Sequence, residues 1–205
     1  MKHEWKKQEK GFYAAKQIPA MIIVPIQNYI MIDGKGNPNH EDFSDRVAAL
    51  YALAYAIKMG FKAAANNADV SREVHDFSVY PLEGVWKQKQ GDDLVKDELE
   101  YTIMIRQPDF ITESMVCKAM EAVKKKKPNP LYEEICFDTM QDGKCIEILH
   151  IGAFDDEPAS FEKMTQFAKK NNLERDKSCH REIYLNNANR VEKSKLKAIL
   201  RFSVK

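Results

Sequence analysis

The chain has 205 residues, which is enough for one domain with a full core or for two small ones. Its 32 Lys and Arg residues against 31 Asp and Glu residues leave a net charge of +1, which argues against a protein that binds nucleic acid through a basic surface. The N-terminus is charged and no apolar run approaches the roughly 18 residues of a membrane span. We therefore expect no export signal, no membrane contact and a cytoplasmic location, with the four cysteines as reduced thiols.

The first part of the chain begins with strand-forming residues and continues into a helix. Apolar β-prone runs at 22–24 and 29–32 lie on either side of Pro25, which belongs at an edge or a bulge because proline donates no hydrogen bond to a sheet. A turn follows. The spacing of apolar residues then predicts a helix over about 40–59, ended by Gly60.

Two strands are predicted next, over 77–86 and 99–106, joined by a polar hairpin loop over 88–97. The second strand alternates apolar and polar residues, which is typical of a half-buried sheet. These strands complete a β-α-β-β order for the first half of the chain.

The second half begins with a helix over 112–127, stopped by Pro128, and then shows the same order as the first. Asp142 and Gly143 predict a hairpin turn, because both residues tolerate a positive φ. The remaining elements are two strands before and after this turn, a helix and two final strands, over 135–139, 144–151, 158–170, 180–186 and 195–201.

The two halves read as an internal repeat, with repeat one over about 19–108 and repeat two over about 109–205 of a single domain. Glu83 of the first repeat corresponds to Glu182 of the second. The order predicts an α+β fold of tandem β-α-β-β repeats with pseudo-twofold symmetry, in which antiparallel sheets are flanked by helices. The region between the repeats is then the expected ligand cleft.

Glu182 is the leading candidate for a functional residue. It lies in an alternating, strand-like segment, so it shares a face with Tyr184 and Asn186. A carboxylate on an aromatic-lined, buried face is costly unless it is paired, and such costs mark functional sites. The alternative is that Glu182 faces solvent on an edge strand.

Several segments together carry a family resemblance. They are Gly34 to Asn39, Ala49 to Lys58, Pro81 to Trp86, Leu149 to Pro158 and His180 to Leu185. In these segments the chain resembles the standalone GyrI-like small-molecule-binding proteins of bacteria. The resemblance spans nearly the whole chain, and it implies the same tandem fold with a ligand cleft between the repeats.

The family resemblance also implies roles for residues. The family includes the drug-binding halves of multidrug-responsive activators, the gyrase-inhibitor protein, and standalone members that look like hydrolases of cyclopropanoid genotoxins. By position, Glu182 takes the role of the principal acidic residue, while Trp86 and Tyr184 match aromatic positions of the cleft. Arg181 and Phe154 depart from the family, which often has histidine and tyrosine there.

Three functions stay open at this point. The first is a module that binds an aromatic or cationic small molecule, with Glu182 as the countercharge. The second is a hydrolase in which Glu182 activates water and Tyr184 or Tyr101 assists. The third is a protein-binding inhibitor. The candidate ligand contacts are Trp86, Tyr101, Phe110, Glu83 and Phe154.

No metal ligands are expected from the sequence, and no cofactor. His40, Glu41 and Asp42 cluster at a helix start, where neutral capping explains them. The cysteines lack the spacing of a zinc site. The sequence leaves the oligomeric state open.

Overall fold

A computed structural model describes residues 1–67, 73–87, 95–176 and 179–205. Its strands, in chain order, are β1 (Lys2–His3), β2 (Ala20–Lys35), β3 (Asp76–Phe77), β4 (Leu82–Lys87), β5 (Glu100–Gln107), β6 (Cys136–Ile151), β7 (Cys179–Tyr184) and β8 (Lys197–Ser203). Its α-helices are α1 (Trp5–Gln8), α2 (Lys10–Tyr13), α3 (Glu41–Asn67), α4 (Glu113–Lys126) and α5 (Glu157–Lys170). Most of the predicted loop over 88–97 lies outside the described residues.

Six strands form a closed barrel in the order β2-β5-β4-β7-β8-β6, and every neighbouring pair is antiparallel. The chain order is β2-α3-β4-β5 and then β6-α5-β7-β8, so the predicted α+β fold of two β-α-β-β units is confirmed. The two units meet at two seams, where β2 pairs with β6 and β4 pairs with β7. The exact repeat boundaries stay a prediction.

The predicted hairpin at Asp142 and Gly143 is wrong. Both residues lie inside β6, which runs unbroken from Cys136 to Ile151 and pairs along most of its length with β2. Gly143 still uses its conformational freedom, because its φ is +68°. The long partner strand β2 supplies hydrogen bonds on both sides of this glycine, so the chain continues where the local sequence favours a turn.

The helix α3 extends beyond the predicted end at Gly60. Phe61 and Ala65 of the added turns are buried, and this packing outweighs the cost of about 1 kcal/mol for a glycine inside a helix. By length and composition alone, residues 41–65 would also suit a membrane span. No such span is expected from the sequence. In the structure the apolar residues Leu50 and Ile57 pack in the core.

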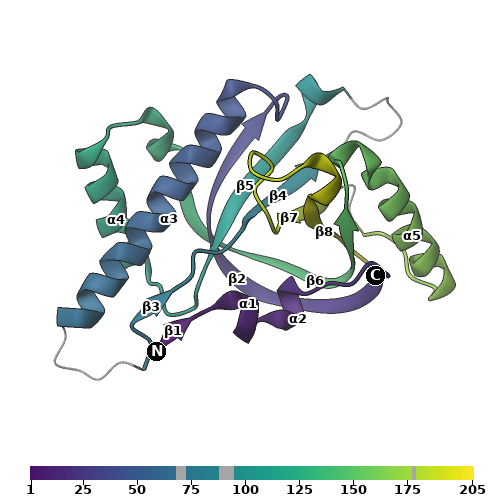
Figure 1. Ribbon diagram of the computed structural model, residues 1–205, viewed down its shortest axis with the longest axis horizontal. Helices are drawn as coiled ribbons and strands as arrows, with labels where there is room; N and C mark the ends of the chain where they lie inside the picture. The colour runs from purple at the N-terminus through teal and green to yellow at the C-terminus, as the bar shows by residue number, and fades with distance from the viewer. Residues whose placement is uncertain (68–72, 88–94, 177–178) are drawn as a thin grey trace.

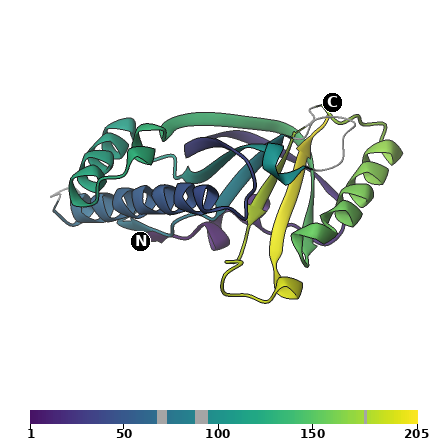
Figure 2. The same ribbon diagram turned by 90° about the horizontal axis from the view of Figure 1, so that it is seen from above.

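The helices α3 and α5 lie on the outer face of the barrel, towards opposite ends of the molecule (Figure 1). The view from above shows α4 beside α3, while α5 lies far from both (Figure 2). The short helices α1 and α2 pack near the barrel interior through Trp5 and Tyr13. Each β-α-β-β unit therefore contributes one helix to the outer face, and the seam between β4 and β7 lies between these two helices.

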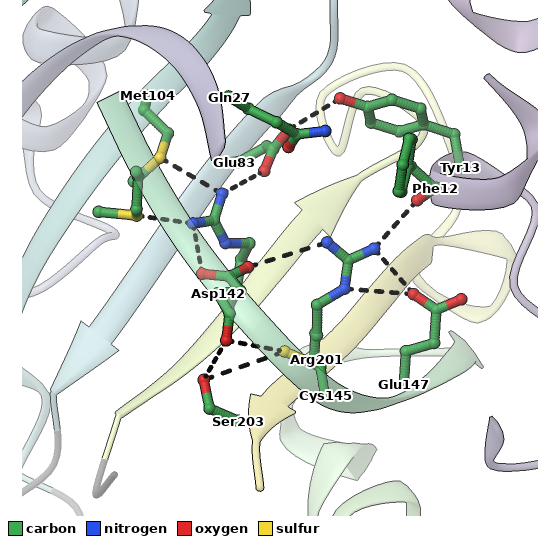
Figure 3. A network of polar contacts seen from close by, with 12 residues as sticks. Phe12, Tyr13, Gln27, Glu83, Met104, Asp142, Cys145, Glu147, Arg201 and Ser203 are labelled. Carbon is green, nitrogen blue, oxygen red and sulfur yellow. Dashed lines mark hydrogen bonds and ion pairs between the residues drawn. The ribbon is translucent and has the colours of Figure 1, made fainter. Parts of the chain in front are cut away.

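The inner face of the barrel holds a network of paired charges (Figure 3). Arg181 donates from Nη1 to Glu83 Oε2 over 2.8 Å and from Nη2 to Asp142 Oδ1 over 2.9 Å. Arg201 donates from Nη2 to Glu147 Oε2 over 2.8 Å. Each buried carboxylate here has an arginine partner, as burial of charge requires.

Candidate functional site

The strand β7 places Arg181 and Glu182 on opposite faces, because successive side chains of a strand alternate. Arg181 joins the inner network, whereas Glu182 lies on the outer face at the seam with β4, directly opposite Gly84. Glu182 is only 8% exposed. The alternative that Glu182 faces solvent is therefore excluded by its burial.

Two neighbours on β7 hold the Glu182 carboxylate. His180 Nε2 lies 2.9 Å from Oε1, and the Tyr184 hydroxyl donates to Oε2 over 2.8 Å. All three side chains share the outer face because they are spaced by two residues along the strand. Burial, followed by the charge of Glu182, raises the pKa of Tyr184 well above its usual value, so this hydroxyl stays protonated.

Trp86 extends the contacts from Tyr184 into β4. Its Nε1 donates to the Tyr184 hydroxyl over 2.9 Å. Gly84 makes this approach possible, because a Cβ at that position would lie 2.8 Å from the indole Nε1 and 3.4 Å from the tyrosine oxygen. The absent side chain opposite Glu182 thus leaves room for the indole ring.

A second carboxyl group, Glu157, lies beside Glu182. It is the first residue of α5 and is only 7% exposed. Burial, followed by the charge and hydrogen bond of Glu182, raises the pKa of Glu157 to about 9. The raised pKa favours the protonated form of Glu157, and a hydrogen bond joins this carboxyl group to Glu182. Such a pair supplies an acid and a base next to each other.

Aromatic rings surround the pair of carboxyl groups. Phe154 packs edge-on against Tyr184 at 5.8 Å, and Phe161 packs edge-on against His180 at 4.7 Å, both between ring centroids. Phe43, at the start of α3, stacks on Trp86 at 5.9 Å. Phe154 is 42% exposed, so it lies where the cluster reaches solvent. The starts of both outer helices thus contribute to one aromatic cluster.

The structure brings together only some of the candidate residues. Glu182, Tyr184, Trp86 and Phe154 form the cluster, and Tyr101 packs on Trp86 with ring centroids 5.2 Å apart. Two candidates lie elsewhere: Phe110 packs with Phe61 and Phe77, and Glu83 lies in the inner network.

The proposed correspondence of Glu83 with Glu182 fails for a geometric reason. In the register of β4 and β7, Glu83 lies opposite Ile183, and Gly84 lies opposite Glu182. Neighbouring positions on a strand face opposite sides of the sheet. The two carboxylates therefore point to different faces, and Glu83 does not share the site of Glu182.

The comparisons with known proteins agree with this fold. The model of the GyrI-like small molecule binding domain matches residues 19–205. The chain belongs to the GyrI-like family. No curated protein matches the sequence.

Solved structures from Listeria innocua are similar to this chain over its full length. An uncharacterized conserved protein is 37% identical with a TM-score of 0.89, covering 99% of this chain and 100% of its own. A hydrolase is 36% identical with a TM-score of 0.89, covering 100% of both chains. The C-terminal domain of EcmrR, 10% identical with a TM-score of 0.53 over 91% of this chain and 96% of its own, shares the fold alone.

A surface hollow of about 700 Å³ lies away from the two carboxyl groups. Trp5 and Tyr13 line it from the N-terminal helices, and Leu185, Asn186 and Lys197 line it from β8 and the segment between β7 and β8. Its lining includes none of the candidate residues. The candidate functional site is therefore the carboxyl and aromatic cluster at the β4–β7 seam.

Sequence reasoning missed two residues of this site. His180 could have been found, because it is two residues before Glu182 on one strand and so must share its face. Glu157 gave no distinguishing signal, since it follows Asp155 and Asp156 in a run that reads as ordinary helix-start chemistry. Glu157, the third of these acids, reaches the site only because α5 packs on the barrel.

Proposed function

We propose that this protein is a hydrolase that adds water to an aromatic small molecule with a strained ring. The observation that carries the proposal is the pair of buried carboxyl groups, Glu157 and Glu182, which lie beside each other, with the pKa of Glu157 raised by burial and by Glu182. Among the residues that the structure describes, neither group forms an ion pair with lysine or arginine. The name of the full-length Listeria relative, a hydrolase, supports the same reaction class.

Glu182 is the base in this proposal. A carboxylate has about four acceptor positions. Hydrogen bonds with His180, Tyr184 and Glu157 occupy three of them. One position is left to take a proton from a water molecule, and the three existing partners hold the carboxylate in a fixed orientation for that transfer.

Glu157 is the acid, while Tyr184, whose hydroxyl stays protonated, orients Glu182. For a cyclopropane ring conjugated to a carbonyl group, the water oxygen bonds to a ring carbon and the carbon–carbon bond breaks. The electron pair moves to the carbonyl oxygen, which takes a proton from Glu157, while Glu182 takes a proton of the water. The hydrogen bond between Glu182 and Glu157 then returns that proton, so the pair is restored.

The substrate class comes from the family resemblance and from the aromatic cluster. Phe154, which is 42% exposed, and Tyr184 place rings beside the pair, with the buried Trp86 next to Tyr184, and aromatic rings stack on flat aromatic ligands. The resemblance to hydrolases of cyclopropanoid genotoxins indicates that the substrate also contains a strained ring. Ring strain supplies part of the driving force, so a single positioned base suffices without a cofactor.

The test is turnover of an aromatic cyclopropanoid, followed by the mass of the small molecule. Wild type should add the mass of one water, and Glu182→Gln should lower kcat by about 100-fold or more, because general base catalysis contributes that much. Glu192→Gln, an exposed glutamate, is the matched control and should leave turnover unchanged. Equal turnover by wild type and Glu182→Gln would contradict the proposal.

A second candidate is a binding module for lipophilic organic cations. An ionised Glu182 beside aromatic rings attracts a cation by charge and by the ring faces. No turnover of the cyclopropanoid, together with tight cation binding that Glu182→Gln weakens, would favour this candidate over the hydrolase.

The third function, protein binding, has one observation in its favour. Met21, Ile23 and Ile26 of β2 expose more than half of their surface. An exposed apolar strand edge of this kind is a surface that a protein partner could cover.

A further inference from the structure

Two carboxyl groups and one imidazole ring converge at the start of α5. One ligand atom each from Glu157, His180 and Glu182 lies within 4.8 Å of the other two. His180 and Glu182 come from one face of β7, and Glu157 comes from the first residue of the helix that packs on it. The set was not visible in the sequence, because 22 residues lie between its first two members, Glu157 and His180.

One atom of this set lacks a partner. Oε1 of Glu157 is buried and accepts no hydrogen bond in the described structure, although the residue is only 7% exposed. An unsatisfied buried acceptor costs about 1–3 kcal/mol. A cation bound between the three groups would satisfy this oxygen.

From this geometry we propose that Glu157, His180 and Glu182 form a binding site for one transition-metal dication of the zinc class. Two carboxylate oxygens and one imidazole nitrogen are the ligand types that Zn²⁺ accepts, and three protein ligands leave a further coordination position open. Hard cations such as Mg²⁺ prefer oxygen ligands alone, so the imidazole favours zinc over magnesium.

Neighbouring side chains support such a site. The Tyr184 hydroxyl donates to Glu182 Oε2 over 2.8 Å and orients that carboxylate, as outer-shell partners of metal ligands do. The ring of Phe161 packs edge-on against His180 and restricts its rotation. The three ligand atoms lie within 4.8 Å of one another, so side-chain adjustments would suffice for zinc bonds of about 2.0–2.2 Å.

This inference goes beyond the proposed hydrolase and does not rest on it. The ion would lie between the two carboxyl groups that the hydrolytic step uses. We therefore expect bound Zn²⁺ to inhibit turnover of the cyclopropanoid, as a competitor of the water-activating arrangement.

The test is calorimetric titration of the chelator-treated full chain with Zn²⁺. We expect one site per chain and at least a 10-fold weaker affinity in His180→Ala and in Glu157→Gln. His40→Ala is the matched control, because His40 is an exposed histidine far from the three ligands in sequence, and its affinity should equal that of wild type.

Zinc also binds thiols, so the cysteines need their own control. Cys179 adjoins His180 in sequence, and Cys117 and Cys136 are exposed. The titration is therefore repeated in a Cys117→Ser, Cys136→Ser and Cys179→Ser background, where the site should remain. Circular dichroism checks that each variant is folded. If a variant is not folded, anomalous scattering from zinc-soaked crystals of the wild type locates the ion instead.

The proposal predicts an anomalous peak between the three side chains. It is overturned if the ion lies elsewhere, if folded His180→Ala and Glu157→Gln bind zinc as tightly as wild type, or if the background with the three serine substitutions binds none.

Discussion

Buried carboxylates have opposite kinds of neighbour on the two faces of the β4–β7 seam. On the inner face, Glu83 is 1% exposed and lies 2.8 Å from Arg181. On the outer face, Glu182 has a second carboxyl group, Glu157, as its neighbour instead of an arginine. The inner arrangement cancels charge, whereas the outer one concentrates acid groups under aromatic rings.

The difference separates structure from function. A buried charge with an opposite partner fills a barrel interior without a net electrostatic cost large enough to unfold the protein. A buried pair of like groups lowers stability and is retained where chemistry or binding needs it. Neighbouring residues on one strand, Arg181 and Glu182, thus have different surroundings because successive side chains of the strand alternate between its faces.

The largest effect on stability is expected from Arg181→Met. The substitution leaves Glu83 and Asp142 buried without their main partner, and removal of one member of a buried ion pair costs about 3–5 kcal/mol. Urea unfolding measures the loss. Adding Glu83→Gln to this variant should recover part of it, and a double variant as unstable as the sum of both single changes would contradict the pairing.

A smaller, pH-dependent effect is expected from Glu157→Gln. The pKa of Glu157 rises from 4.5 to about 9 on folding, so the folded chain keeps a proton that the unfolded chain loses. Its contribution to stability is therefore complete below about pH 4.5 and is lost as the pH rises towards 9. Glutamine is neutral throughout, so the stability of the variant relative to wild type should rise by on the order of 1 kcal/mol for each pH unit between about pH 5.5 and pH 8.5.

Thermal unfolding at several pH values checks this prediction. Glu192→Gln, at an exposed position, should follow the wild-type pH profile and serves as the control. A Glu157→Gln profile parallel to that of wild type would show that Glu157 is not held neutral in the folded chain.

The smallest effect is expected from Trp86→Phe. The variant keeps a ring in the aromatic cluster but loses the Nε1 donor to Tyr184, a hydrogen bond worth about 1 kcal/mol. We expect kcat/KM for the cyclopropanoid to fall about fivefold, in proportion to that energy. Phe110→Leu is the comparison, since Phe110 packs away from the cluster, and it should lower the melting temperature without this drop in kcat/KM.

Much of the fold was predictable from the sequence because periodicity records which face of each element is buried. The predicted helix over 112–127 agrees closely with α4, and the helix over 158–170 with α5. The errors arose where tertiary pairing overrides a local signal. Gly143 lies within a strand and Gly60 within a helix, because a long partner strand and a buried helix face hold them there.

The site was less predictable, because it depends on register and docking. The alternation around Glu182 and Tyr184 was visible along one strand. Whether Glu83 joins them depended on the pairing of β4 with β7, and a shift of one residue reverses the face. Glu157 reaches the site only through the placement of α5, which no local pattern encodes.

The most direct test of this account compares the unfolding free energies of Glu83→Gln and Glu182→Gln in urea. Both changes remove one charge from a buried glutamate on the same seam. We predict that Glu83→Gln loses about 3 kcal/mol or more, because Arg181 is left without its main partner, whereas Glu182→Gln changes stability by less than about 1 kcal/mol. Equal losses in the two variants, or a larger loss in Glu182→Gln, would contradict the division between a structural inner face and a functional outer face.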